Sequence, residues 1–382
     1  MKFQKTAVLL AMSTALAAPF AASAEANFDA YGRVVAGLYY LDAQGGDSGQ
    51  LSMAGWKQTP VDSFIGLKGR EDLGNGWYAG FQLESGIAVD SGEFGKSGTG
   101  FNTVSRVYVG NEHVEFTAGR MPNFTAATSP YSFYGRTHAN LTRSSLPGLA
   151  PAGVTFNAAE LDNLIAVTTP FKNGFFAEAL YSNGMEAGEK DYDWEDRDRT
   201  VQVATGWVGE NMRFGVNFTY AAQRDVAGST EKNPTKGIHL VGNYNFGGPE
   251  VSLVLYKGFD DWKIGAANDM AALVNKAGGT GNYNTSASGM DTTAAFLSFG
   301  YPFGSHYLSV AATYLNAKWK GKSAGMKETD GDVWMGGVLY YYQMSKRTQI
   351  YAGGSYAAGD KLLNGVDRFN QLMLTSGMIH RF

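Results

Sequence analysis

The strongest constraint on the fold of this chain is a rhythm: segments of about ten residues alternate apolar and polar side chains, and the gaps between them are alternately short and long. A period of two puts successive side chains on opposite faces of a β-strand. A bilayer cannot satisfy the backbone groups of an open sheet edge, so strands with one lipid-compatible face must close on themselves. The rhythm predicts an all-β fold, a transmembrane antiparallel β-barrel. In residues 212–220 the lipid-compatible face is Met212, Phe214, Val216, Phe218 and Tyr220.

The number of such segments predicts sixteen strands. The short connections mostly carry the Gly, Asn or Pro that tight turns require. In outer-membrane barrels the short turns lie at the periplasmic end and the long loops outside. The long connections are 42–60, 90–101, 121–159, 184–197, 224–235, 258–291, 317–331 and 359–367. The strands are expected to start near Asn27, Val61, Gly76, Asn102, His113, Glu160, Asn173, Asp198, Met212, Lys236, Glu250, Thr292, Ser305, Asp332, Arg347 and Arg368.

The N-terminus is typical of a secretory signal peptide. Lys2 and Lys5 precede a short apolar stretch, and Ala22-Ser23-Ala24 forms a small-residue cleavage site. A short N-terminal anchor helix is the alternative, but no stop-transfer pattern follows. We therefore expect residues 1–24 to be removed and residues 25–382 to form one domain exported to the envelope.

Composition excludes several other classes of protein. The chain has no cysteine, so it has no disulfide framework and no cysteine nucleophile. Without the signal peptide, 29 basic residues face 35 acidic ones, which argues against nucleic-acid binding. The five histidines show no metal-ligand spacing, and no nucleotide-binding or nucleophile-elbow motif occurs. We expect no enzyme and no cofactor; a soluble β-sandwich, a barrel hydrolase and an adhesive barrel are the alternatives.

A set of short motifs resembles the strands of one family. The motifs are residues 65–69, 71–74, 81–84, 105–110, 119–120, 163–170, 174–175, 345–348 and 377–382. Together they resemble the trimeric general-diffusion porins of Gram-negative bacteria, especially those of β-proteobacteria. The resemblance implies a homotrimer whose third loop folds inward, and an outer-membrane channel for small hydrophilic solutes and ions, surrounded by lipid and lipopolysaccharide. It also implies that Phe382 belongs to the signal read by the outer-membrane barrel assembly machinery.

Two features together suggest which residues line the pore: the face of the strand on which a residue falls in the alternation, and its position in a motif. Arg106 and Glu84 are expected to meet across neighbouring strands and hold each other rigid. The alternative is that these are solvated lumen charges with no selective role. The family usually has basic residues where this chain has Phe64 and the pair Leu161-Asp162, so its basic ladder is shorter. The candidate constriction residues are Arg33, Lys68, Glu84, Arg106, Tyr108, Tyr134, Arg136 and Arg143.

The third loop, residues 121–159, contains no Asp or Glu, although it holds Arg136, His138 and Arg143. A basic loop facing a basic wall should favour anions. The alternative is that its arginines pair with barrel acids and pin the loop. The acidic run in residues 186–198 of the fourth loop could oppose anions or share divalent cations with lipopolysaccharide, but a solvated loop is the simpler interpretation.

Two further hypotheses concern residues outside the constriction. Arg120 shares parity with an apolar face, so we expect it at the trimer interface, paired with an acid such as Glu93 of a neighbouring subunit; a snorkelling edge residue is the alternative. The second hypothesis is a substrate-specific channel for a sugar or phosphate-type solute on the same barrel. Its stacking residues would be Tyr192, Trp194, Trp262 and Trp319.

Overall fold

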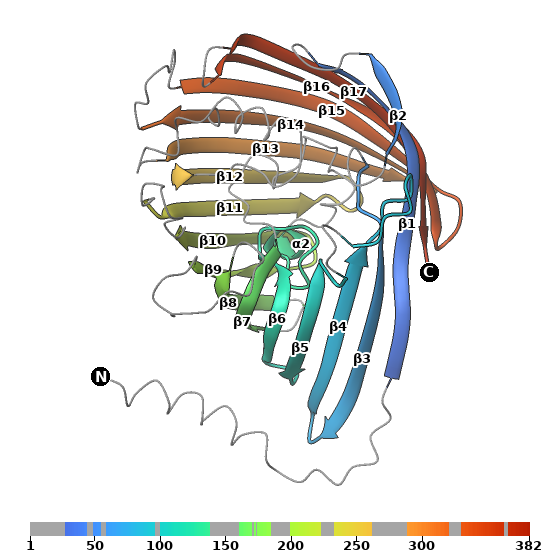
Figure 1. The fold of residues 1–382 in the computed structure, drawn as a ribbon, viewed down its shortest axis with the longest axis vertical. Coiled ribbons are helices and arrows are strands. Elements are labelled where there is room, and N and C mark those ends of the chain that lie inside the picture. The colour runs from blue at the N-terminus through green and yellow to red at the C-terminus, as the bar shows by residue number, and fades with distance from the viewer. Residues whose placement is uncertain are drawn as a thin grey trace.

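The computed structural model is a closed antiparallel β-barrel (Figure 1). It describes residues 27–43, 49–54, 59–95, 100–137, 160–169, 172, 174–184, 199–222, 233–261, 289–320, 330–362 and 366–382. The segment 1–24, predicted to be a signal peptide, lies outside this part of the chain, as do the acidic run 186–198 and the residues Tyr192, Trp194 and Trp262.

Each barrel strand pairs antiparallel with its neighbours in the sequence. The strands are β1 (Asn27–Ala43), β2 (Gln50–Ala54), β3 (Phe64–Gly74), β4 (Trp77–Gly86), β5 (Val104–Gly110), β6 (Glu115–Pro122), β7 (Glu160–Thr168), β8 (Gly174–Gly184), β9 (Arg199–Val208), β10 (Met212–Ala222), β11 (Thr235–Asn245), β12 (Glu250–Asp261), β13 (Met290–Phe303), β14 (His306–Trp319), β15 (Asp330–Gln343), β16 (Thr348–Leu362) and β17 (Val366–Arg381).

The barrel has sixteen strand positions, as predicted. β2 is an addition, because its residues fall inside the predicted loop 42–60. It pairs with the upper part of β1, while β3 pairs with the lower part of β1 on the same side. β2 and β3 therefore share one position in the barrel. Each predicted start lies within three residues of an observed strand start.

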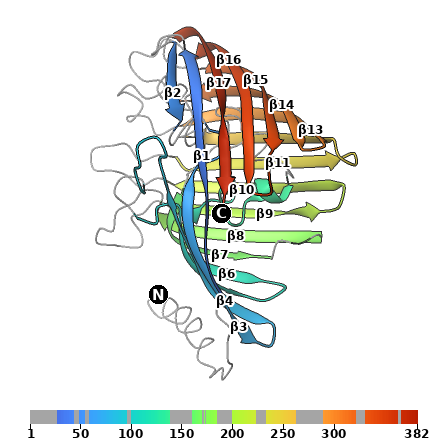
Figure 2. The ribbon, with the colours of Figure 1, turned by 90° about the vertical axis from the view of Figure 1, so that its right-hand side faces the viewer.

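The seam of the barrel lies between β1 and β17, which run side by side in Figures 1 and 2. Pairing begins at Arg33 opposite Arg381 and continues to Ala43 opposite Gln371. Below it, Gly32 and Phe382 exchange two backbone hydrogen bonds of 3.2 Å. A Cβ on Gly32 would lie 2.5 Å from the backbone oxygen of Phe64 and 2.8 Å from Cζ of Phe382, so glycine allows both β3 and the terminal ring to approach the seam closely.

The two faces of the wall follow the predicted alternation. On β10, Phe214 and Phe218 are 47% and 52% exposed, whereas Asn217 and Thr219 are 0% and 4% exposed. The apolar face points outward, where it suits lipid, and the polar face points inward. Among the described residues, no helix is long and apolar enough to cross a membrane.

The third loop folds inward, as expected. After β6 it forms the short helix α2 (Phe133–Thr137), which contacts β9, β10 and β11 (Figure 1). A Cβ on the inward-facing Gly215 would lie 2.8 Å from the ring of Phe133, so the helix packs directly on the wall. Alternation of apolar residues does not predict α2, because a helix of five residues has too little propensity signal.

Candidate pore constriction

A row of cations lies on the inner face of β1, β3 and β5. Lys68 forms an ion pair with Asp29, with 3.8 Å between Nζ and Oδ2, and its ammonium lies 4.9 Å from the ring centre of Tyr31. Arg70, two residues further along β3, lies 3.6 Å from the ring of Tyr78. Aromatic faces attract cations while leaving their charge in place. Lys68 and Arg70 are both exposed, so they present positive charge to the lumen.

Arg33 lies at the seam, opposite Phe64 on β3 and Arg381 on β17. Its Nε donates to the carbonyl oxygen of Asp62, and its guanidinium lies 5.1 Å from the ring centre of Phe64. Phe64 stands where the resemblance to the porins implies a basic residue. The structure shows what it does here: it packs against a cation that the chain supplies from β1.

Arg106 is held on all sides. Its side chain is 9% exposed and forms an ion pair with Glu115, at 3.3 Å. Its Nε donates to Oε1 of Gln82 at 2.9 Å, and its guanidinium lies 4.7 Å from the rings of both Tyr108 and Tyr131. Tyr131 belongs to the third loop and also hydrogen-bonds Arg106 and Glu115. The loop and the wall therefore meet at Arg106.

The prediction that Arg106 pairs with Glu84 is wrong, because Arg106 pairs with Glu115. The register places Gln82 opposite Arg106 and Val104 opposite Glu84. Glu84 instead accepts hydrogen bonds from Tyr31 at 2.5 Å and from Gln82 at 2.7 Å, so it reaches Arg106 only through Gln82. Glu115, the true partner, was missed. Glu115 shares the inward face of β6 with Thr117, so the alternation could have placed it in the lumen. The alternation could not show that its side chain extends along the wall past Tyr108 to reach Arg106.

The third loop meets the wall with a neutral group at this point. Burial raises the pKa of Tyr131, so its phenol stays protonated near neutral pH and donates to Glu115. The described part of the loop, 121–137, has no carboxylate of its own. The acid that balances Arg106 therefore comes from the barrel.

Arg136 and Tyr134 occupy the contact between α2 and the wall, not the open lumen where we expected them. Arg136 forms an ion pair with Glu178 of β8, with 3.2 Å between Nε and Oε2, and the two side chains are 2% and 0% exposed. Its Nη2 also donates to the carbonyl oxygen of Thr169 at 2.8 Å. The hydroxyl of Tyr134 lies 2.7 Å from Nδ1 of His239, and both residues are fully buried. The alternative interpretation, that a loop arginine pairs with a barrel acid, describes Arg136.

Arg120 also has a different partner from the one expected. Its guanidinium pairs with Asp162 of β7 in the same chain, and its Nε donates to the carbonyl oxygen of Asn102 at 2.7 Å. A bulge in the β6–β7 ladder between Gly119 and Met121 puts Asp162 on the side of Arg120. Arg120 therefore has an acidic partner within its own subunit, and its predicted place at the trimer interface, near Glu93 of a neighbouring subunit, stays a prediction.

The remaining candidate residues are Tyr108, Phe382 and Arg143. Tyr108 is half-buried beneath Arg106, and Phe382 is 45% exposed on the outer face. Arg143 and His138 lie outside the described residues. In the described part of the chain no cluster of His, Asp or Glu could hold a metal ion. The arrangement offers fixed charges and rings around a passage, which can select solutes by size and charge.

Comparisons with known proteins agree with this geometry. The model of the Gram-negative porin family matches residues 7–362. An outer-membrane porin protein of Bordetella pertussis is 27% identical over 97% of this chain and 99% of its own length. Outer membrane porin protein 32 of Delftia acidovorans is 29% identical over 66% of this chain and 69% of its own length.

Solved structures show the same fold. The anion-selective porin from Comamonas acidovorans superposes with a TM-score of 0.64 at 20% identity, covering 94% of this chain and all of that one (100%). OmpT of Vibrio cholerae superposes with a TM-score of 0.63 at 12% identity, covering 96% of this chain and 100% of its own. At these identities the likeness is one of fold.

Proposed function

This chain belongs to the family of Gram-negative porins, and from that premise we propose that it forms a water-filled channel in the outer membrane for passive diffusion of small hydrophilic solutes and ions, with a preference for anions. A channel of this kind does no covalent chemistry. It selects by diameter and by fixed charge at the narrowest point.

One observation supports the anion preference above the others: the third loop meets the basic wall through the neutral Tyr131, not through a carboxylate. An acidic loop facing Arg106 would set a transverse field and attract cations. Without it, the loop adds no negative charge opposite the wall, and the wall keeps the exposed Arg70 and Lys68, of which Lys68 is paired with the exposed Asp29. A solved porin of the same fold, from Comamonas acidovorans, is described as anion-selective, which is consistent with this proposal.

The surroundings of the channel belong to the same proposal. We infer export with loss of residues 1–24, a homotrimer in the outer membrane in contact with lipid and lipopolysaccharide, and no enzymatic activity. Phe382 would be read by the barrel assembly machinery, and its position at the seam suits a residue that must be in place when the barrel closes.

Single-channel recording tests the channel itself. The purified protein in a planar bilayer should give current steps whose conductance rises in proportion to the KCl concentration. Conductance that saturates, and is blocked by glucose or inorganic phosphate, would support the substrate-specific channel instead. If membranes contain the folded protein but show no current steps, the protein is a structural or adhesive barrel and not a channel.

A further inference from the structure

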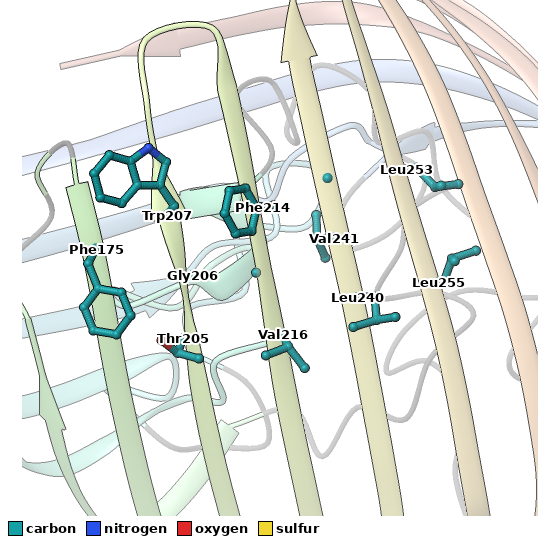
Figure 3. A pocket seen from close by; sticks show the side chains of 12 residues that line it. Phe175, Thr205, Gly206, Trp207, Phe214, Val216, Leu240, Val241, Leu253 and Leu255 are labelled. Atoms are coloured by element: carbon teal, nitrogen blue, oxygen red, sulfur yellow. The ribbon is translucent and has the colours of Figure 1, made fainter.

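The outer wall carries a groove across β8 to β12, shown in Figure 3. It has a volume of about 570 Å³, within the range of roughly 300–1,000 Å³ usual for ligand sites. Aromatic side chains flank it on the left of the view and leucines on the right. The groove is separate from the pore, because most of its lining side chains, such as Phe214, Leu240 and Leu253, belong to the outward face of the wall.

Two rows of outward side chains build the groove. The first row contains a gap, because Gly242 stands between the larger side chains of Phe214 and Leu253. The second row is continuous and consists of Thr205, Val216, Leu240 and Leu255. The first row consists of Phe175, Trp207, Phe214, Gly242 and Leu253.

The backbone does not require glycine at the gap. Gly242 has no positive φ, and a Cβ built on it would meet nothing within 4 Å. A larger residue would fit there and would suit the strand better, because glycine weakens a strand interior. Its missing side chain leaves a notch open only to the space outside the protein.

The groove spans about one leaflet of the bilayer. Trp207 lies beside the short turn to β10; a Cβ on Gly209 in that turn would lie 3.0 Å from its indole nitrogen. Short turns mark the periplasmic end, and tryptophans there sit at headgroup level. At the other end, Leu255 is five residues into β12, or about 16 Å along the strand at ~3.3 Å per residue, which a strand tilt of about 35–45° reduces to roughly 12–13 Å of depth. Half of a hydrocarbon core about 30 Å thick is a similar depth.

These features identify an occupant. The groove is continuous with the apolar belt of the barrel, so its neighbour is lipid, and it begins at the periplasmic interface. Its outward lining offers a single hydroxyl, that of Thr205, and no charge. We propose that it binds one acyl chain of a glycerophospholipid from the periplasmic leaflet, seated in the notch at Gly242. This site depends on the barrel spanning the membrane, and not on its ion preference.

Photo-crosslinking tests the site. The full-length mature protein is reconstituted in phosphatidylethanolamine–phosphatidylglycerol vesicles with a trace of phosphatidylethanolamine carrying a diazirine in mid-chain. Labelled peptides are then mapped by mass spectrometry. Wild-type protein should be labelled around Val216, Leu240 and Leu255 above the average of the outer belt. Gly242→Leu should lose that enrichment, because its side chain fills the notch.

Gly336→Leu is the matched control. Gly336 also faces outward, with open space where a Cβ would stand, but it lies on β15, away from the groove, so the enrichment should remain. If Gly242→Leu does not fold, Val216→Phe fills the same groove from β10. Labelling no higher than the belt average, or unchanged by filling the groove, would overturn the proposal. So would loss of the oligomer in Gly242→Leu alone, since the face would then bind protein.

Discussion

At the scale of single residues, Arg106 links the wall to the third loop. It has a carboxylate on one side, two tyrosine rings around it and a glutamine behind it. Such an arrangement fixes the position of the charge. Glu115 balances Arg106, so the potential that a passing ion meets is the sum of these two groups, the exposed pair Lys68 and Asp29, and the exposed Arg70.

Glu115→Gln should make the channel more anion-selective. The change removes one negative charge from the constriction and leaves Arg106 in place. A unit charge about 4 Å from an ion contributes ~1 kcal/mol in water, or roughly a five-fold change in the anion-to-cation permeability ratio. The reversal potential under a KCl gradient measures it. Glu112→Gln is the matched control, because Glu112 is exposed in the turn beside His113.

The faces of the charged residues were predictable from the sequence, but their partners were not. A period of two assigns Arg33, Lys68 and Arg106 to the inner face without knowledge of the register. Partners depend on which residues stand opposite and on how far a long side chain leans. The register put Gln82 opposite Arg106, and a bulge gave Arg120 an acid from its own chain.

At the scale of elements, the third loop is held by its own anchors. α2 is five residues long, too short to be stable by itself, so its place depends on contacts with the wall. Two of these contacts are buried: Arg136 with Glu178, and Tyr134 with His239. A rigid loop gives the constriction a constant diameter. The family resemblance implied an inward loop, but the sequence gave no signal for the helix or for its barrel partners.

Arg136→Ala should loosen this loop and destabilise the barrel. Removing one partner of a buried ion pair leaves an uncompensated charge, which costs about 3–5 kcal/mol. Guanidinium unfolding of the reconstituted protein should show a lower midpoint, and open-channel current should become noisier.

Replacing both partners tests whether the instability of Arg136→Ala comes from the unpaired charge or from lost packing. Arg136→Met combined with Glu178→Leu leaves no buried charge, so most of the lost stability should return. If the double variant is as unstable as Arg136→Ala, the ion pair is not what the single substitution disrupts, and the anchor lies elsewhere in the loop.

At the scale of the whole molecule, the chain closes when its last strand meets its first. The seam joins residues that are far apart in the sequence, so it is the contact with the greatest loop-closure cost. Phe382 hydrogen-bonds Gly32 through its backbone and covers it with its ring. The number of strands and their alternation were predictable, because every strand repeats the pattern. The strand β2 was not predictable, because five residues are too few to show an alternating pattern.

Phe382→Ala should reduce the yield of folded barrel in cells much more than in refolding from urea into lipid vesicles. A signal read by the assembly machinery matters only where that machinery is present. Met378→Ala is the matched control, since Met378 is 45% exposed on the same face of β17, as Phe382 is. Equal losses in cells and in vesicles would assign Phe382 to packing at the seam alone.

The sign of the reversal potential of the wild-type channel under a KCl gradient tests the central claim most directly. We expect the sign of an anion-selective pore, moved toward cations by Arg106→Gln, because that substitution leaves Glu115 unbalanced beside the neutral loop. A cation-selective wild type, or a potential that Arg106→Gln does not move, would contradict the assignment of selectivity to this wall.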